Sequence, residues 1–361
     1  MAKASDRART RLARLLHFVR GHRTAVVAVQ DHPDPDGIAC AAALKLLLSE
    51  KARLDVTLAA TGEVVRVENR AALQFLGETL ADTASLDLAA FDLRALVDTQ
   101  PGFGNCFWPD DVEAHIVIDH HPRGPRVTSD QFTDIRTDYG AASTILTEYL
   151  QAADIEPNVQ LATALLYGIK TDTQNLSRGA SDADTDAFLY LYPRANHRAL
   201  AKIERERLPR DYFATLARAL ADCRIYGNVA ICNLGTIPAP DILGEMADFF
   251  LRIQGIRWVL VHGLVESRLH LSVRTDLRQG KAGDLAAALL DDIGSGGGHG
   301  MLAGGQAHLP TDVDDDGETD TLEETVREIE LRFLRLIEVP TRTPERLIPK
   351  ATADPPEEAD T

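Results

Sequence analysis

The sequence predicts an α/β fold with two domains, a parallel sheet with flanking helices followed by a smaller α/β domain. Two observations favour this fold class. Apolar, β-branched runs alternate with helix-forming runs through the first half of the chain, a pattern typical of a parallel sheet with helices on both faces. The chain has 361 residues, of which 45% are hydrophobic, which is enough for two domains with sizeable cores.

Each element of the first half is predicted from its residue pattern. The run TAVVAVQ indicates a buried strand because it is continuous and rich in branched residues, and GIACAAALKLLL is rich in helix formers. The same reasoning predicts strands at 24–30, 53–60, 92–98 and 114–119. It predicts helices at 37–48 and 68–75, and a wholly helical region from residue 139 to about residue 222.

Strand signals return from residue 224 and indicate the second domain. The expected strands are 224–234, 256–266, 267–276 and 306–310, and the expected helices are 241–253, 281–293 and 318–336. A glycine-rich loop is expected at 294–305, before the last strand. We therefore divide the chain into a first domain at 1–205, a linker helix at 206–223, a second domain at 224–338 and a disordered, acidic, Pro-rich tail at 339–361.

The composition argues against several classes of protein. The formal net charge of −17 disfavours binding of long duplex DNA or other long nucleic acid. The four cysteines are scattered without a CxxC spacing, which fits a reduced cytoplasm. The N-terminal segment has the pattern of an amphipathic helix, and no stretch approaches the ~20 apolar residues of a membrane span. We expect a soluble, cytoplasmic protein with no membrane partner.

Acidic residues follow several of the predicted strands and one predicted helix. The segment QDHPDPDG, which contains Asp34 and Asp36, follows the first strand, and Asp98 closes the third. Asp119, followed by two histidines, closes the fourth strand, and Asp172 follows an apolar helix. The carboxyl ends of parallel strands face one crevice, so we expect these side chains to meet.

Crowded carboxylates need positive charge among them, because they repel one another and resist burial. Oxygen and imidazole ligands without thiolates suit Mn²⁺ or Mg²⁺ better than structural zinc. Two such ions ~3.5–4 Å apart would share a carboxylate and hold a hydroxide for attack on phosphorus. A turn or a helix cap explains any one of these aspartates, but it does not explain their recurrence at the ends of four elements. We therefore favour a metal site.

A second group of candidate residues lies in the glycine-rich segment GSGGGHGMLAGG. Gly297 and Gly298 can bring backbone N–H groups close to a phosphate, with His299 as a further donor. Arg274, at the end of a predicted strand, could make a bidentate phosphate contact. The alternative for the glycine-rich segment is a flexible loop that binds no ligand. The alternative for Arg274 is a solvated side chain with no substrate contact.

Together these residues resemble the DHH phosphoesterase superfamily, in the subgroup that carries a C-terminal DHHA1 domain. Four motifs match in order, namely HPDPDG, the strand-end DTQ, the signature Asp-His-His at 119–121, and GIKTDTQNLS. The segment GGGHGMLAGG resembles the GGGH-x-x-A-G motif, and the resemblance spans roughly residues 20 to 310. Short proteins of this kind are similar to nanoRNases, pAp phosphatases and cyclic-dinucleotide phosphodiesterases. The resemblance implies a catalytic DHH domain, a substrate-binding DHHA1 domain and two Mn²⁺ ions in the cleft between them.

The resemblance also implies roles for single residues. Asp34 and Asp98 would hold the first ion. The second ion would be held by Asp36, Asp98, His120 and Asp172. His121 would contact the scissile phosphate, and Asp119 would orient the histidine pair. The phosphate or terminal nucleotide of the substrate would be bound by Arg274, Gly297, Gly298 and His299.

One position departs from the pattern of the family. Many short members carry a histidine four residues before the first motif aspartate, where this chain has Gln30. His32, two residues before Asp34, matches the single-strand exonuclease branch instead. Either His32 completes the first metal site from another place, or that site is weakened. We include His32 among the expected metal ligands.

The leading hypothesis is a Mn²⁺-dependent phosphodiesterase or phosphatase, with Mg²⁺ as the alternative ion, that acts on short oligoribonucleotides, pAp or dinucleotides. One alternative is an inorganic pyrophosphatase. Another is a nucleotide-sensing module with a degraded first metal site, which Gln30 would explain. A nicotinamide dehydrogenase is disfavoured because no GxGxxG follows the first strand. The substrate, the polarity of cleavage and the oligomeric state, including a homodimer, are left open.

Overall fold

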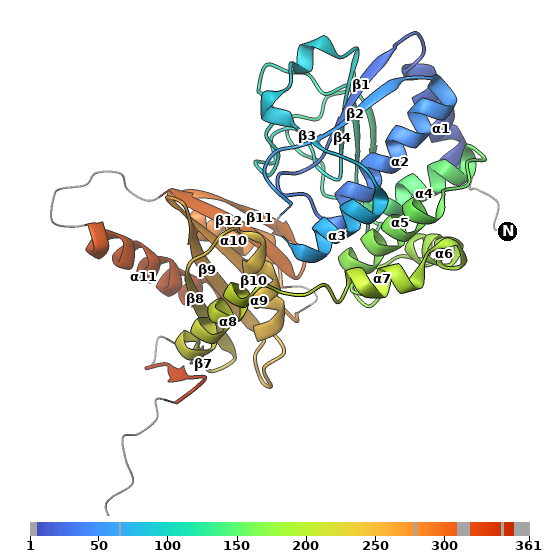
Figure 1. The fold of residues 1–361 in the computed structure, drawn as a ribbon. Coiled ribbons are helices and arrows are strands. Elements are labelled where there is room, and N and C mark those ends of the chain that lie inside the picture. Colours follow the sequence, from blue (N-terminus) through green and yellow to red (C-terminus); the bar gives the residue numbers. More distant parts are fainter. Residues whose placement is uncertain (1–5, 65, 278–279, 309–317, 341–342, 350–361) are drawn as a thin grey trace, which may run out of the picture. The chain divides into compact units, whose positions relative to one another are not determined.

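The computed structural model describes residues 6–64, 66–277, 280–308, 318–340 and 343–349. The chain divides into two compact units, Met1–Arg207 and Leu208–Thr361, each with its own sheet. Figure 1 shows them as the blue-to-green and the yellow-to-red parts of the ribbon. Among the described residues, no helix has the length and the apolar character that crossing a bilayer requires.

The first unit is built on a six-stranded sheet of order β3-β2-β1-β4-β5-β6, in which every neighbouring pair is parallel. The strands are β1 (Thr24–Ala28), β2 (Asp55–Ala60), β3 (Ala81–Asp82), β4 (Leu93–Val97), β5 (Ile116–Asp119) and β6 (Phe132–Ile135). This confirms the predicted parallel sheet. Strands β3 and β6 were not predicted, because β3 has only two residues and the FTDI segment of β6 lacks the continuous apolar run that marks β5.

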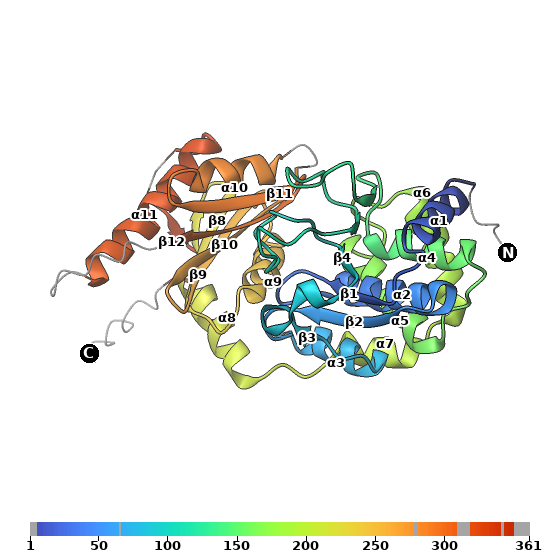
Figure 2. The same ribbon diagram turned by 90° about the horizontal axis from the view of Figure 1, so that it is seen from above.

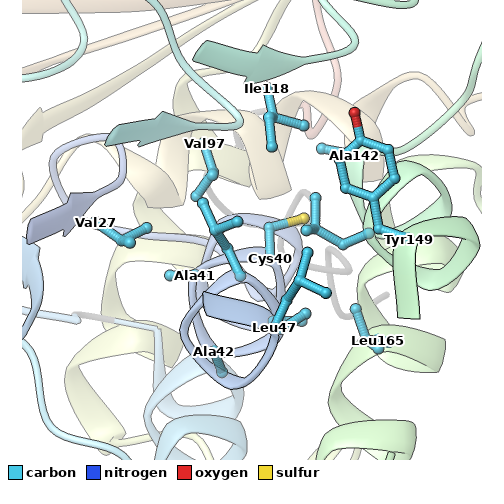
Figure 3. Packing of buried hydrophobic residues seen from close by; sticks show 14 of the residues in the cluster. Val27, Cys40, Ala41, Ala42, Leu47, Val97, Ile118, Ala142, Tyr149 and Leu165 are labelled. Atoms are coloured by element: carbon cyan, nitrogen blue, oxygen red, sulfur yellow. The ribbon is translucent and has the colours of Figure 1, made fainter. Parts of the chain in front are cut away.

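Helices cover one face of this sheet (Figure 1). They are α1 (Asp6–Phe18), α2 (Pro35–Ala52), α3 (Val67–Leu76), α4 (Ala142–Ala152), α5 (Val159–Asp172), α6 (Asp182–Leu191) and α7 (His197–Ile203). Helix α2 is rich in alanine and leucine and begins with Asp34 as N-cap and Pro35 at its first position. Figure 3 shows its side chains packed among those of β4, β5, α4 and α5, so α2 lies at the centre of the core.

The opposite face is covered by loops and two short 3₁₀ helices, so the prediction of helices on both faces was wrong. The 3₁₀ helices are η1 (Thr83–Ser85) and η2 (Leu88–Ala90). Val26 and Leu96 point to this face, where they belong to a cluster with Leu88 and Trp108. The connections between β3, β4, β5 and β6 are all described and contain no α-helix. Loop side chains therefore complete the core on this side.

The second unit is a seven-stranded mixed sheet of order β11-β12-β10-β9-β8-β7-β13. Its strands are β7 (Arg224–Tyr226), β8 (Val229–Thr236), β9 (Trp258–Val265), β10 (Arg268–Thr275), β11 (Gly294–His299), β12 (Leu302–His308) and β13 (Glu345–Arg346). Helices α8 (Arg210–Asp222) and α9 (Asp241–Phe250) pack on one face, and α10 (Ala282–Leu290) and α11 (Glu318–Leu336) pack on the other (Figure 2). This confirms the predicted second α/β domain. Helix α8 lies where the linker helix was expected and packs on this sheet through Ala219.

The glycine-rich segment at 294–305 belongs to a hairpin of β11 and β12, and the prediction of a loop was wrong. Close packing explains the glycines. A Cβ at Gly296 would lie 2.5 Å from the backbone oxygen of Ala286 in α10, and a Cβ at Gly294 would collide with Gln306 on the neighbouring strand. The glycines therefore allow a strand to approach a helix closely, which composition alone does not distinguish from loop flexibility.

Part of the segment that was expected to be a disordered tail is described in the structure. Strand β13 pairs with β7, and the backbone N–H of Leu347 donates to the backbone oxygen of Cys223. The side chain of Leu347 is partly buried against the cluster formed by α8, α9 and the sheet, which gives this segment an anchor. Residues 350–361 lie outside the described residues.

Candidate metal centre

The candidate site begins at the carboxyl ends of β4 and β5. These strands are neighbours with Val97 opposite Ile118, and the backbone N–H of Asp98 donates to the backbone oxygen of Ile118 at 3.0 Å. Asp98 has φ +58°, a left-handed conformation that aspartate tolerates better than most residues. Asp119 is the last residue of β5. The parallel pairing therefore brings these two acids to the same edge of the sheet.

Asp36 enters the site from the first turn of α2 and is fully buried. Its Oδ2 accepts from the backbone N–H of Ala142 at 2.7 Å, and its Oδ1 accepts from that of Ser143 at 2.9 Å. These N–H groups lie at the start of α4, where a helix favours negative charge. Burial raises the pKa of Asp36, although His120 opposes the shift.

His120 lies between two carboxylates. Its Nε2 is 3.4 Å from Asp98 Oδ1 and 3.5 Å from Asp172 Oδ2, and its Nδ1 is 3.3 Å from the backbone oxygen of Tyr139. Asp172 reaches this position because it is the last residue of α5. Burial lowers the pKa of His120, but the charges of Asp172 and Asp36 outweigh it, so the net shift is upward.

Two overlapping sets of side chains offer ligand atoms within 4.8 Å of one another. One set consists of Asp36, Asp98, His120 and Asp172, and the other of Asp98, Asp119, His120 and His121. Asp98 and His120 belong to both sets, so they are at the centre of the site. The structure thus brings together six of the residues that the sequence analysis singled out.

The chemistry of these side chains fits a hard divalent cation. Asp98 is 2% exposed, and its Oδ1 is buried with no hydrogen-bond donor among the described residues. Burial and the carboxylates of Asp36 and Asp34 raise the pKa of Asp98 well above its ordinary value, and the same causes raise that of Asp172. Buried acids in such number favour protonation unless a cation lies among them. Oxygen and imidazole donors are ligands that Mn²⁺ and Mg²⁺ accept.

Asp119 holds the histidine pair in place. Its Oδ1 accepts from the backbone N–H of His120 at 2.7 Å and lies 2.8 Å from Nδ1 of His121. Its Oδ2 accepts from Nε2 of Gln100 at 2.6 Å. Burial acts against the shift in both groups, but the hydrogen bond between them lowers the pKa of Asp119 and raises that of His121. Asp119 is therefore ionised, and it favours the charged form of His121.

Two of the expected ligands, His32 and Asp34, are in neither set. His32 has φ +52°, its ring packs over Gly62, and its Nδ1 lies 3.0 Å from the backbone oxygen of Glu63 in the loop after β2. Asp34 is the N-cap of α2, where its Oδ1 accepts from the backbone N–H of Gly37 at 3.0 Å. Its charge still raises the pKa of Asp98.

Gln30 contacts the cluster directly. Its Nε2 donates to Asp98 Oδ2 at 3.3 Å. Its Oε1 is buried, has no donor among the described residues, and would lie 2.5 Å from a Cβ at Gly37. Gly37 therefore leaves the space that the Gln30 side chain fills.

Two residues that support the site received no role in the sequence analysis. Gln100 connects Asp119 with the backbone N–H of Gly124, which donates to its Oε1 at 2.7 Å. Gly168, inside α5, lies against Asp36. Gln100 could have been found as a polar residue two positions after the strand-end Asp98. Gly168 could have been found as a glycine inside a strong helix pattern, which often marks a close contact.

The expected substrate-binding residues lie in the second unit. Arg274, in β10, places its Nε 3.1 Å from Oδ1 of Asp248 in α9. Its Nη1 donates to Ser272 Oγ and to the backbone oxygen of Ala303. The guanidinium therefore has structural partners within its own unit.

Gly297 and Gly298 differ in their surroundings. A Cβ at Gly297 would have no atom within 4 Å, whereas a Cβ at Gly298 would collide with the neighbouring strand β12. His299 is the last residue of β11, and its side chain is outside the described part of the structure.

Comparison with known families agrees with this site. Residues 25–169 match the model of the DHH family, N-terminal domain, and this range includes Asp36, Asp98 and residues 119–121. Together with the fold, the match places the chain in the DHH phosphoesterase superfamily.

The chain is also similar to individual proteins and solved structures. The uncharacterized protein MJ1633 of Methanocaldococcus jannaschii is 35% identical over 280 residues, which are 77% of this chain and 56% of that protein. The chain therefore spans about half the length of this curated relative. An exopolyphosphatase-related protein from Bacteroides fragilis superposes with a TM-score of 0.68 at 14% identity, covering 90% of this chain and 96% of that one. RecJ in complex with Mn²⁺ from Thermus thermophilus gives a TM-score of 0.51 at 14% identity, covering 94% and 56%. At such identities the likeness is one of fold.

Proposed function

We propose that the chain is a Mn²⁺-dependent phosphoesterase that hydrolyses short oligoribonucleotides, pAp or linear and cyclic dinucleotides. The observation that carries the proposal is the set formed by the buried Asp36, Asp98 and His120 and the partly buried Asp172, at the carboxyl edge of a parallel sheet. Such a set is unfavourable without a cation, and membership of the DHH phosphoesterase superfamily gives the class of reaction.

We propose a place for each of the two cations. Asp36, Asp98, His120 and Asp172 would hold one Mn²⁺, and Asp34 with Asp98 would hold a second. When bound, these ions supply an acidified water and neutralise charge on the phosphate. The RecJ of similar fold was determined in complex with Mn²⁺, which fits this choice of ion, and Mg²⁺ is the alternative.

His121 and Asp119 prepare the place of the scissile phosphate. Asp119 Oδ1 accepts the hydrogen bond from Nδ1 of His121, which fixes the ring orientation and raises the pKa of the imidazole. The second nitrogen, Nε2, then donates to a phosphate oxygen and stabilises the negative charge that grows there during hydrolysis. Gln100 holds Asp119 from the other side, so the histidine is oriented before substrate binds.

The substrate we propose is short. A net charge of −17 opposes the approach of long polyanions, whereas a mononucleotide or dinucleotide brings few charges to one site. We propose that Arg274, Gly297, Gly298 and His299 of the second unit bind the far end of such a substrate, and that the protein works in the cytoplasm.

One observation favours a second candidate, a nucleotide-sensing module. The amide of Gln30 donates to Asp98 Oδ2. A histidine bound to a metal ion at position 30 would not make this bond, and the oxygen could then coordinate a cation. A chain that retains one cation site of two could bind a nucleotide without cleaving it.

The test is a panel of pAp, a two-to-five-residue RNA, a cyclic dinucleotide and inorganic pyrophosphate, each with Mn²⁺. We expect release of mononucleotide or phosphate from the nucleotides. Asp98→Ala should abolish it, and Asp182→Ala, an exposed aspartate of α6, should not. Two bound Mn²⁺ per chain with no turnover of any nucleotide would overturn the proposal. Turnover of pyrophosphate alone would favour a pyrophosphatase, and nucleotide binding with one Mn²⁺ and no turnover would favour the sensor.

A further inference from the structure

The loop that follows β4 is anchored at several points. Thr99 Oγ1 donates to Asn105 Oδ1 at 2.8 Å, and the backbone oxygen of Asn105 accepts from the backbone N–H of Asp31 at 2.8 Å. The backbone N–H of Phe107 donates to Asp31 Oδ1 at 2.9 Å. These bonds tie residues 99–107 to the segment after β1, so side chains on this loop are held in place.

Phe103 lies on this loop beside His121. The centroids of the two rings are 6.2 Å apart, and their planes meet at 89°, an edge-to-face contact. Gly124 lies close against the phenyl ring, because a Cβ at that position would be 2.8 Å from Phe103 Cε1. The same glycine donates its N–H to Gln100, which in turn donates to Asp119. Phe103 is therefore fixed relative to the group that would contact the phosphate.

The position of Phe103 is not explained by core packing. It is half-buried and belongs to none of the hydrophobic clusters formed by the described residues. The neighbouring Phe107 is more exposed, at 44%, and makes no described ring contact with His121. A fixed aromatic ring with accessible surface, next to a phosphate-binding group, is a surface on which a planar ring can stack.

We propose that Phe103 is a stacking platform for the nucleobase adjacent to the phosphate that His121 contacts. The base of a nucleotide lies one sugar away from its phosphate, which suits a ring that touches the histidine itself. Stacking tolerates every base, so the platform selects nucleotides over inorganic phosphates without choosing a sequence. This proposal rests on the proposed function and makes it more specific, since it excludes pyrophosphate and polyphosphate as preferred substrates.

A competing role for Phe103 is to orient His121 through the edge-to-face contact alone. In that case its removal would slow hydrolysis of all substrates alike, through kcat. A stacking platform instead affects KM, and only for substrates that carry the base. The two roles therefore differ in kinetic parameter and in substrate dependence.

The experiment compares the full chain with Phe103→Ala, Phe103→Trp and the control Phe107→Ala, all with Mn²⁺. The substrates are the dinucleotide pApA and two analogues in which one or the other base is removed. We expect Phe103→Ala to raise KM for pApA roughly 5- to 150-fold, the range for the loss of one stacked base. We expect it to leave one of the two abasic analogues unchanged, Phe103→Trp to retain the wild-type KM, and Phe107→Ala to have no effect.

A parallel binding measurement separates failure of this proposal from failure of the proposed function. Fluorescently labelled pApA is titrated with each protein in Mn²⁺, which needs no turnover. If wild type binds pApA but does not cleave it, the proposed function fails. The ratio of the dissociation constants of wild type and Phe103→Ala for pApA then still tests the platform. Equal affinity of wild type and Phe103→Ala, a kcat loss shared by all three substrates, or no binding by wild type would each overturn the platform.

Discussion

Gly168 in α5 lies directly against Asp36 in α2. A Cβ added to the glycine would be 2.7 Å from Asp36 Oδ1 and 2.6 Å from Ser143 Oγ. Gly168 is four residues before Asp172, so both lie on the same side of α5. The close approach of the helix at the glycine is therefore what brings Asp172 to the other carboxylates.

Gly168→Ala is expected to disturb the site through this contact. Alanine within a helix normally stabilises relative to glycine by up to about 1 kcal/mol. Here the extra methyl group has no space, so we expect a loss of about 1–3 kcal/mol in the free energy of unfolding and weaker binding of Mn²⁺. Chemical denaturation and calorimetric titration measure the two effects. A variant more stable than wild type would show that the helices are further apart than we describe.

Asp98→Asn should separate metal binding from stability. The buried carboxylates repel one another, and burial raises the pKa of Asp98 well above its usual value. Removing this acid should therefore raise the free energy of unfolding of the chelated protein by about 1–3 kcal/mol, since a pKa raised by one pH unit costs about 1.4 kcal/mol, while abolishing stabilisation by Mn²⁺. Wild type should gain about 2.7 kcal/mol at a Mn²⁺ concentration of about 100 Kd. The proposed cation site would be refuted if Mn²⁺ raised the melting temperature of both proteins equally.

Gln30→His tests the departure from the family pattern. The substitution replaces an amide that donates to Asp98 Oδ2 with an imidazole that can coordinate a metal ion. We expect the weaker of the two Mn²⁺ to bind on the order of tenfold more tightly, as measured by calorimetry and metal content. Gln30→Ala, which supplies no ligand, is the control and should not tighten binding. If histidine and glutamine give the same affinity and stoichiometry, residue 30 does not contribute to the metal site.

Asp134 in β6 should govern the acid sensitivity of the first unit. It is fully buried, accepts from Arg136 Nη2 at 2.7 Å and from the Tyr149 hydroxyl at 2.6 Å. Burial alone would raise its pKa, but the bonds to Arg136 outweigh burial and lower it. A lowered pKa in the folded state contributes stability above the unfolded value of ~3.9, and this contribution is lost as the pH falls through the folded value.

Asp134→Asn leaves Glu148 as the carboxylate that pairs with the buried Arg136, so we expect a loss of about 1–3 kcal/mol at pH 7. The difference between wild type and variant should begin to shrink below pH ~4, where this aspartate becomes protonated in the unfolded chain, and it should be lost below the lowered pKa of the folded state. Urea unfolding at pH 7 and pH 3 measures both values. A difference that stays constant across this range would mean that Asp134 does not titrate as described.

The sequence predicts most of this fold because its elements have long, distinct patterns. Helix α11 was expected at 318–336 and is observed there, and strands β1, β2, β4 and β5 lie within the predicted runs. The failures share a cause. The hairpin at 294–305 and the short strands β3 and β6 are defined by contacts with other elements, and local composition carries little information about such contacts.

The candidate site could be located but not completed from the sequence. A parallel sheet brings its strand ends together, which is why the strand pattern alone places Asp98 and the residues 119–121 on one edge. The sequence could not show which aspartate is a metal ligand and which is a helix cap, because Asp34 and Asp36 have the same local context. They differ in their partners: Asp36 accepts from the backbone of α4, whereas Asp34 caps α2. The roles of Gln100 and Gly168 depend on partners far along the chain, which one sequence does not reveal.

The carboxylate of Asp36 is bonded to the start of α4, 106 and 107 positions away along the chain. Contacts between such distant positions form late, because a large loop must close first. A divalent ion added during refolding therefore finds no assembled ligand set until α2 and α4 have docked. Binding of the ion should therefore be observed only after the first unit has reached its native topology. The ion should not accelerate the folding steps that precede the docking of α2 and α4.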